Sequence, residues 1–267
     1  FFNLIFISED QFDIAIIGAV ITIGLPIIML IYAGANLLFK VKTYPGVSLG
    51  LVVVWVIGIF MCAMVGIRMG TELSNNEETV NVEFLDNSIN DYYFEASDVE
   101  MPGEGVLEDR YSSISLDGDS IYMNDVRFYI HKSKTDSLEV KVVKEGSGKT
   151  IKNAINNAKM ITYNYEINDS SVVLSNFLAT IKENKIRGQQ VKFKLYLPVG
   201  KSIYLDKSLR HIIYDIDNVT RTRDRKMLGK RWVMLEEGLT CLDCTEIDGV
   251  TATQLDSIRA YQPLVVE

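Results

Sequence analysis

Two long apolar segments lie near the start of the chain, and a region of alternating apolar and polar residues follows them. Ile14–Phe39 is a run of 26 residues without a charge, and Leu49–Ile67 is a run of 19. A helix of 26 residues is about 39 Å long, enough to cross a hydrocarbon core about 30 Å thick. Because the connection between the runs is short, we expect a membrane helical hairpin with spans at about 14–39 and 47–68.

Pro26 lies in the middle of the first span. Proline has no backbone N–H, so it removes the helical hydrogen bond to the carbonyl of Thr22 and is expected to kink the helix there. Membrane helices tolerate such prolines where neighbouring groups satisfy the freed carbonyl. We therefore interpret Pro26 as a packing kink rather than a gating hinge.

The charges beside the spans predict their orientation. The connecting loop contains Lys40 and Lys42 and no acid, whereas Glu9, Asp10 and Asp13 precede the first span. The positive-inside rule places this loop in the cytoplasm. Both outer ends of the hairpin, and everything that follows it, are then expected to face outward.

The chain divides into two parts with different charge. Residues 1–71 hold three cations and three acids, so the formal net charge of −8 lies entirely on residues 72–267. Nucleic-acid binding needs a clustered excess of Lys and Arg, so this balance argues against it, and also against broad attraction to anionic lipid. We expect a transmembrane region at 1–71 and an outward-facing, β-rich domain at 72–267. The first residue is Phe rather than Met, and we expect the chain to be a piece of a longer one.

After Gly70 the apolar residues recur with a period of two, which is typical of half-buried strands. The clearest runs lie at 80–84, 126–131, 138–142, 161–167 and 191–197, and shorter strands are expected at 112–116, 120–124, 203–205, 211–214 and 231–234. The polar segment Glu72–Thr79 is expected to be a short stalk. The segment Glu145-Gly-Ser-Gly148 is expected to be a turn.

One segment has helical spacing instead. Ile151, Ala154, Ile155 and Ala158 fall at i, i+3, i+4 and i+7, so they predict a short amphipathic helix at about 149–159 that packs through its Ile and Ala face. Many short strands with a single helix predict an all-β outer domain, either a sandwich or solenoid-like.

A glycine-rich segment and the two histidines are candidates for ligand binding or catalysis. Glu145-Gly-Ser-Gly-Lys-Thr150 resembles part of a phosphate loop, but Val143 stands where that motif needs its first glycine. His131 and His211 both lie in strand-like segments, and neither is near a cysteine in the sequence. We therefore expect no catalytic residues, no cofactor and no metal, and do not expect an enzyme.

Cys241 and Cys244 form the most specific short motif in the chain, two cysteines three positions apart. A pair at this spacing can form a disulfide, hold half of a zinc site or act as a redox pair. We favour a structural disulfide in an oxidising compartment, with free thiols and redox or metal chemistry as the alternatives. Residues three apart in a regular strand point to opposite faces, so the bond requires Leu242 and Asp243 to turn.

A basic cluster stands out against the acidic background of the outer part. It contains Asp224 as its one acid and comprises Arg221, Arg223, Arg225, Lys226, Lys230 and Arg231. This cluster is a candidate interaction patch for lipid headgroups or an acidic partner, and a solvated loop is the alternative interpretation.

Several stretches resemble one family. They are Gly24-Leu-Pro26 to Gly34, Leu38-Phe39-Lys40, Trp55-Val-Ile-Gly58, Gly188-Gln-Gln-Val191 to Gly200, Tyr204-Leu-Asp206, Asp215-Ile-Asp-Asn218-Val, Trp232-Val-Met234 and Gly238-Leu-Thr-Cys241-Leu-Asp-Cys244. The first three resemble the membrane region of large PspC-domain (phage-shock-protein-C-like) proteins of Gram-negative bacteria. The rest are similar to the adhesin-like toast-rack β-solenoid domain of the same proteins. The PspC motif itself, which precedes this region in the family, is not in the chain.

The resemblance implies a role in envelope stress and no catalytic residues. The leading hypothesis is a non-enzymatic inner-membrane protein whose periplasmic β domain binds other membrane or periplasmic proteins, or assembles as a homo-oligomer, while the hairpin lies in the lipid bilayer. The alternative is a structural accessory subunit of a larger secretion or transport complex. A periplasmic thiol enzyme centred on Cys241 and Cys244 is a third hypothesis.

Overall fold

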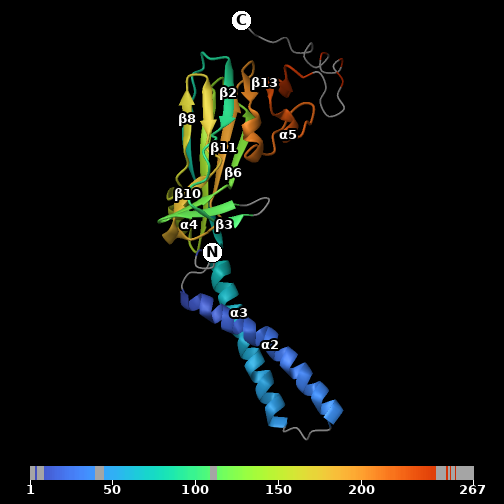
Figure 1. Ribbon diagram of the computed structural model, residues 1–267. Helices are drawn as coiled ribbons and strands as arrows, with labels where there is room; N and C mark the ends of the chain where they lie inside the picture. The colour runs from blue at the N-terminus through green and yellow to red at the C-terminus, as the bar shows by residue number, and fades with distance from the viewer. Residues whose placement is uncertain are drawn as a thin grey trace.

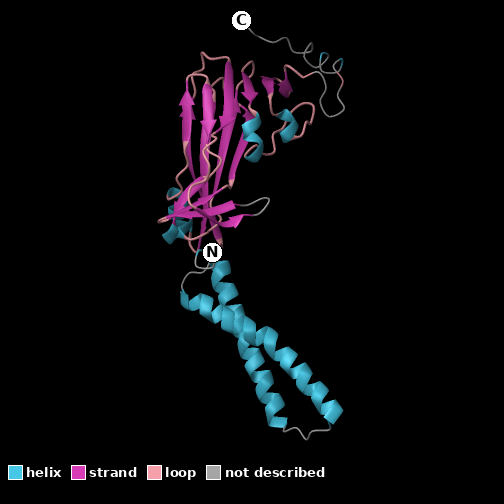
Figure 2. Ribbon diagram, in the orientation of Figure 1, coloured by secondary structure: helices cyan, strands magenta, loops and turns pink. Residues whose placement is uncertain are grey.

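The computed structural model describes residues 4, 9–39, 45–108, 113–244, 251, 253 and 256. A helical hairpin lies below an elongated β domain (Figure 1, Figure 2). Its helices are α2 (Glu9–Phe39) and α3 (Pro45–Glu72), and both are long and apolar enough to cross a membrane. The loop lysines Lys40 and Lys42, on which the expected orientation depends, lie outside the described residues.

The two helices pack at glycines and are joined by interhelical hydrogen bonds between Trp55 and Thr22 and between Thr22 and Cys62. A Cβ atom at Gly58 would lie 2.5 Å from the side chain of Ile21, so only glycine allows this approach. The indole Nε1 of Trp55 on α3 donates a hydrogen bond of 3.0 Å to the carbonyl oxygen of Thr22 on α2. That carbonyl is the one that Pro26 leaves without a helical partner. The proline is therefore accommodated by a specific contact within the hairpin.

The described part of the β domain contains fourteen strands in three sheets. The strands are β1 (Asn75–Phe84), β2 (Asp91–Ala96), β3 (Glu104–Glu108), β4 (Ser113–Asp117), β5 (Ser120–Met123), β6 (Val126–Lys132), β7 (Glu139–Gly148), β8 (Tyr165–Asn168), β9 (Ser171–Leu174), β10 (Leu178–Ile181), β11 (Gln190–Leu197), β12 (Ser202–Leu205), β13 (Lys230–Leu235) and β14 (Gly238–Cys241). The sheets run β1-β7-β11-β6, β10-β5-β4-β3 and β14-β13-β12-β2-β9-β8. Both antiparallel and parallel pairs occur, the latter being β11 with β6, β12 with β2, and β2 with β9.

The core lies between the four-stranded sheet that contains β1 and the six-stranded sheet. Phe94 of β2 stacks on Phe128 of β6 at 5.3 Å between ring centroids, and Phe193 of β11 meets Phe128 at 5.8 Å. All three side chains are fully buried. The period of two in the sequence therefore corresponds to strands with one face on this shared core.

Within the described residues, four short helices complete the domain. They are α4 (Ile151–Lys159), η1 (Lys182–Asn184), η2 (Lys207–His211) and α5 (Asp224–Met227). The expected helix at 149–159 is α4, with Ala154 and Ala158 buried, although Ile151 is exposed rather than packed. The one amphipathic helix that the spacing predicts is thus present, and η1, η2 and α5 are further elements of about one turn that have no periodic signal.

Three expectations for local structure are wrong. The polar stalk is absent, because α3 ends at Glu72 and β1 begins at Asn75. The expected turn Glu145–Gly148 is the end of β7, which pairs in register with Asn75–Glu78. The expected strand 211–214 is the end of η2 and a turn, in which only Ile213 bridges to Phe128. In each case a partner distant in the sequence decides the conformation.

Candidate functional site

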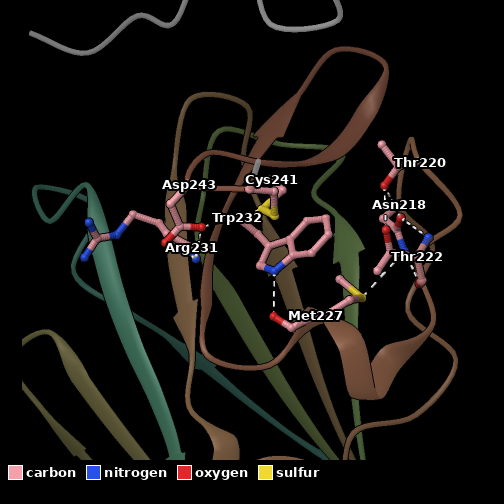
Figure 3. Close-up of a disulfide and its surroundings, with 9 residues drawn as sticks. Asn218, Thr220, Thr222, Met227, Arg231, Trp232, Cys241 and Asp243 are labelled. Carbon is pink, nitrogen blue, oxygen red and sulfur yellow. Dashed lines mark hydrogen bonds between the residues drawn. A yellow bond between two sulfur atoms is a disulfide. The ribbon is translucent and has the colours of Figure 1, made fainter. Parts of the chain in front are cut away.

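The basic cluster lies at the end of the β domain that is farther from the helices, around α5 and β13 (Figure 1). Arg221, Arg223, Arg225 and Lys226 are exposed on the loop and helix before β13, and Lys230 is half-buried. Arg231 separates from them: its guanidinium pairs with Asp91 on β2 at 3.0 Å. Figure 3 shows Arg231 on one side of Trp232 and the loop residues Asn218 and Thr222 on the other. The cluster is therefore divided over two faces.

The loop that carries the arginines is built around Asn218. The Oδ1 atom of Asn218 accepts hydrogen bonds from the backbone N–H of Thr222 (2.7 Å) and the hydroxyl of Thr220 (3.1 Å), while its Nδ2 donates to the carbonyl of Thr222 at 2.8 Å. Arg221 has a φ of 53°, which such a tight turn requires. These bonds hold exposed cations on an ordered loop.

A second set of contacts supports this corner from below. The carboxylate of Asp224 accepts the backbone N–H groups of Asp215 (2.8 Å) and Ile216 (3.1 Å). The fully buried Trp232 donates its indole N–H to the carbonyl of Met227 at 2.9 Å, so the end of α5 is tied to β13 (Figure 3).

Cys241 and Cys244 are joined by a disulfide beside Trp232 (Figure 3). Their Cα atoms are 5.7 Å apart, Cys241 is the last residue of edge strand β14, and Leu242 and Asp243 form a bend. The Asp243 carboxylate accepts the backbone N–H of Arg231 at 3.0 Å. The disulfide and Asp243 together fasten the end of the β13–β14 pair.

Cys241, Asp243 and Cys244 are close enough to be considered as a metal site, since their ligand atoms lie within 4.8 Å of one another. Metals bind the thiolate form of cysteine, and bonded sulfurs have no thiolate to offer. A structural zinc site also needs four ligands. The residues present therefore fit a structural disulfide and do not fit a metal site.

The segment that resembles a phosphate loop serves helix packing. A Cβ atom at Gly146 would lie 2.8 Å from the backbone N of Ala158, and one at Gly148 would lie 2.5 Å from that of Ala154. The hydroxyl of Thr150 caps α4 by accepting the N–H of Asn153 at 3.2 Å. The glycines thus let α4 lie directly on β7.

The two histidines differ in their surroundings. His131 of β6 stacks on Tyr129 (6.0 Å) and lies 5.4 Å from the ring of Tyr196, between centroids. Burial and nearby Lys194 lower the pKa of His131, so the neutral ring is favoured. His211 is exposed at the end of η2. His131 is accounted for by this aromatic packing.

The outward face of β6 and β11 carries a cluster of aromatic side chains that no sequence motif indicates. It gathers Tyr129, His131 and Tyr196, and the ring of Tyr214 beside them lies 4.5 Å from the guanidinium carbon of Arg127. The alternating pattern in the sequence could have indicated this cluster, because aromatic and cationic side chains occupy the positions expected to face solvent on both strands.

Two family models match the chain. One describes the PspC transmembrane region and matches residues 1–73; the other describes a toast-rack domain found in some PspC proteins and matches residues 114–247. The second match covers half of the chain, from β4 past the disulfide. No curated protein and no solved structure matches.

Proposed function

Since the chain is a PspC-family membrane protein with a toast-rack β domain, we propose that it acts without catalysis in the envelope-stress response of the bacterial inner membrane. Its β domain lies in the periplasm and binds a protein partner there. The arginine-bearing loop at the membrane-distal corner is the binding surface, and the partner presents an acidic surface to it.

The direct coupling between the β domain and the hairpin carries this proposal. Only Leu73 and Ser74 separate α3 from β1. The Nε atom of buried Arg187 lies 3.9 Å from the carboxylate of Glu72, the last residue of α3. The carbonyl of Leu4, which precedes α2, accepts the N–H of Ile186 at 2.8 Å. A load applied to the β domain therefore reaches α3 directly, and it also reaches Leu4 on the N-terminal side of α2.

An insertion tests the coupling. A flexible Gly-Ser segment placed between Leu73 and Ser74 should abolish tolerance of envelope stress while the β domain stays folded and bound to its partner. The same segment inserted after Lys134, in the β6–β7 loop, is the matched control. Unchanged stress tolerance with the insertion at 73 would refute a role for the coupling.

Cross-linking tests the binding surface. A photo-reactive residue at position 225 should form an adduct in stressed cells, and the adduct should be lost when Arg221, Arg223 and Lys226 are replaced by Gln. Lys134, exposed elsewhere, provides the control position. An adduct with twice the mass of the chain would identify the partner as a second copy. Equal adducts at 225 and 134 would argue against a specific surface.

A further inference from the structure

The base of the β domain is held close to the membrane surface. The uncharged run of α3 ends at Ile67, and five further residues, about 8 Å of helix, reach Glu72. The headgroup layer on each side of the hydrocarbon core is about 5–8 Å thick. Glu72 therefore lies at the outer limit of the headgroups, and β1 begins at most about 11 Å beyond it.

Two elements of the β domain lie next to this point. Helix α4 packs beside β1 and β7, and Figure 1 shows it at the end of the domain that adjoins α3. Residues of α4 and of the segment around η1 line, together with Glu72, a polar hollow of about 400 Å³. Asn157, Asn184 and Arg187 are among its lining side chains. The surface formed by α4 and the η1 segment is therefore the one that approaches the headgroups.

This surface exposes large apolar side chains. Leu73 is 52% exposed, Ile151 57%, Met160 50% and Ile181 38%. Ile151 is the residue that the helical spacing assigned to the packed face of α4. Exposed apolar side chains at this depth gain by inserting into the interfacial region of a bilayer.

The same surface carries lysines, in contrast to the acidic chain as a whole. Lys149, Lys152, Lys159 and Lys182 are exposed, and Lys185 is half-buried. Burial lowers the pKa of Arg187, which also lies here, and Glu72 opposes that shift. The acids around this set include Glu72, Asp119 and Glu183, and Glu77 of β1, which is paired with Gly146 beneath α4; the five lysines and Arg187 outnumber these four. Lysines near a membrane surface extend toward headgroup phosphates while their stems cover apolar surface.

We propose that this basal surface, defined by the five lysines and by Leu73, Ile151, Met160 and Ile181, docks on the anionic phospholipid headgroups of the membrane that α2 and α3 span. The observations that carry it are continuity with α3, exposed apolar residues, and cations on an otherwise acidic domain. The docking requires that the basal end of the β domain face the membrane. It does not depend on which side of the membrane the domain lies, or on any protein partner.

Fluorescence quenching tests the proposal in the full chain. The chain, with Cys62→Ser, is reconstituted into bilayers of phosphatidylcholine alone or with one third phosphatidylglycerol. A fluorophore is attached to Ile151→Cys or Met160→Cys, and to Val199→Cys as a control. Val199 is also apolar and 42% exposed, but it follows the membrane-distal end of β11. Lipids brominated near the headgroup serve as the quencher.

We expect severalfold stronger quenching at 151 and 160 than at 199, and an increase with phosphatidylglycerol. Replacing Lys149, Lys152, Lys159, Lys182 and Lys185 by Gln should remove that increase. Near-ultraviolet circular dichroism checks that each labelled variant is folded. Equal quenching at 151 and 199, or quenching that is the same in both bilayers, would overturn the proposal. These quenching results do not depend on whether position 225 forms a cross-link to a partner. The failure of one proposal can therefore be distinguished from the failure of the other.

Discussion

At the scale of single residues, the membrane hairpin contains a donor that is matched to a proline. Pro26 deprives the carbonyl of Thr22 of its helical partner, and the indole of Trp55 on the other helix supplies the missing hydrogen bond. Within a bilayer, where water is scarce, an orphaned carbonyl is costly. The pair therefore couples the kink in α2 to the position of α3.

Replacing Trp55 by Phe keeps an aromatic ring and removes the donor. We expect Trp55→Phe to destabilise the hairpin by about 1 kcal/mol, because interhelical hydrogen bonds in membranes are of that size. In a Pro26→Ala background the N–H of Ala restores the bond to Thr22, so the same change should cost less. Unfolding in detergent measures both; equal costs in the two backgrounds would show that the indole does not act through that carbonyl.

The disulfide is the second feature at this scale. The bond closes a very short loop, so its entropic contribution is small, and Cys241→Ser with Cys244→Ser should cost about 2 kcal/mol or less. Mass spectrometry of the peptide from unreduced protein, purified from its native membrane, should find it two hydrogens lighter than the reduced form. Two alkylatable thiols would contradict both the bond and placement in an oxidising compartment.

At the scale of elements, α4 depends on two glycines of β7. Gly146 and Gly148 face the backbone of α4 at Ala158 and Ala154, and neither position leaves room for a methyl group. Small residues on both sides thus set the distance between helix and strand. This packing also fixes the direction in which Ile151 and the lysines of α4 project.

A methyl group at Gly148 should push α4 away from the sheet. We expect Gly148→Ala to destabilise the β domain by about 1–3 kcal/mol, as overpacking in a close contact does. Gly105→Ala in β3, where a Cβ atom has no neighbour within 4 Å, is the control and should change stability by less than about 0.5 kcal/mol. A thermal melt of the full chain gives both values, and equal shifts would contradict the packing role.

The hydrophobic pattern predicted the elements whose own sequence carries a clear apolar run or period. It missed those whose conformation depends on a partner distant in the sequence. The two spans could be located because each is a long uncharged run, and β6, β11 and the first half of β7 because buried and solvent-facing positions alternate along them. The polar residues Asn75–Thr79 read as a stalk because their partners, Lys144–Gly148, lie seventy residues away. Loop closure of that kind has no local signature.

The same limit applies to the candidate surfaces. Six basic residues close in sequence predict a single patch, yet strand β13 turns Arg231 toward Asp91 and away from the loop. Conversely, the lysines of α4 and the η1 segment come from separate stretches and are gathered only by the fold. Composition averaged over the domain concealed them.

At the scale of the whole molecule, orientation in the membrane is the prediction with the widest consequence. We expect a fluorescent maleimide that cannot cross membranes to label Lys134→Cys in spheroplasts, and to label Lys42→Cys only after lysis. The reason is the positive charge of the loop that contains Lys40 and Lys42. The opposite pattern would place the β domain in the cytoplasm.

The β domain is attached to the hairpin at two points, through the α3–β1 junction and through Leu4, and this has a rotational consequence. A domain held at the α3–β1 junction and also at Leu4 turns less freely about the membrane normal than one held at a single point. The arginine-bearing corner of each copy therefore points along a direction set by the hairpin. We expect that a torque applied at that corner would be transmitted to α3 through the α3–β1 junction.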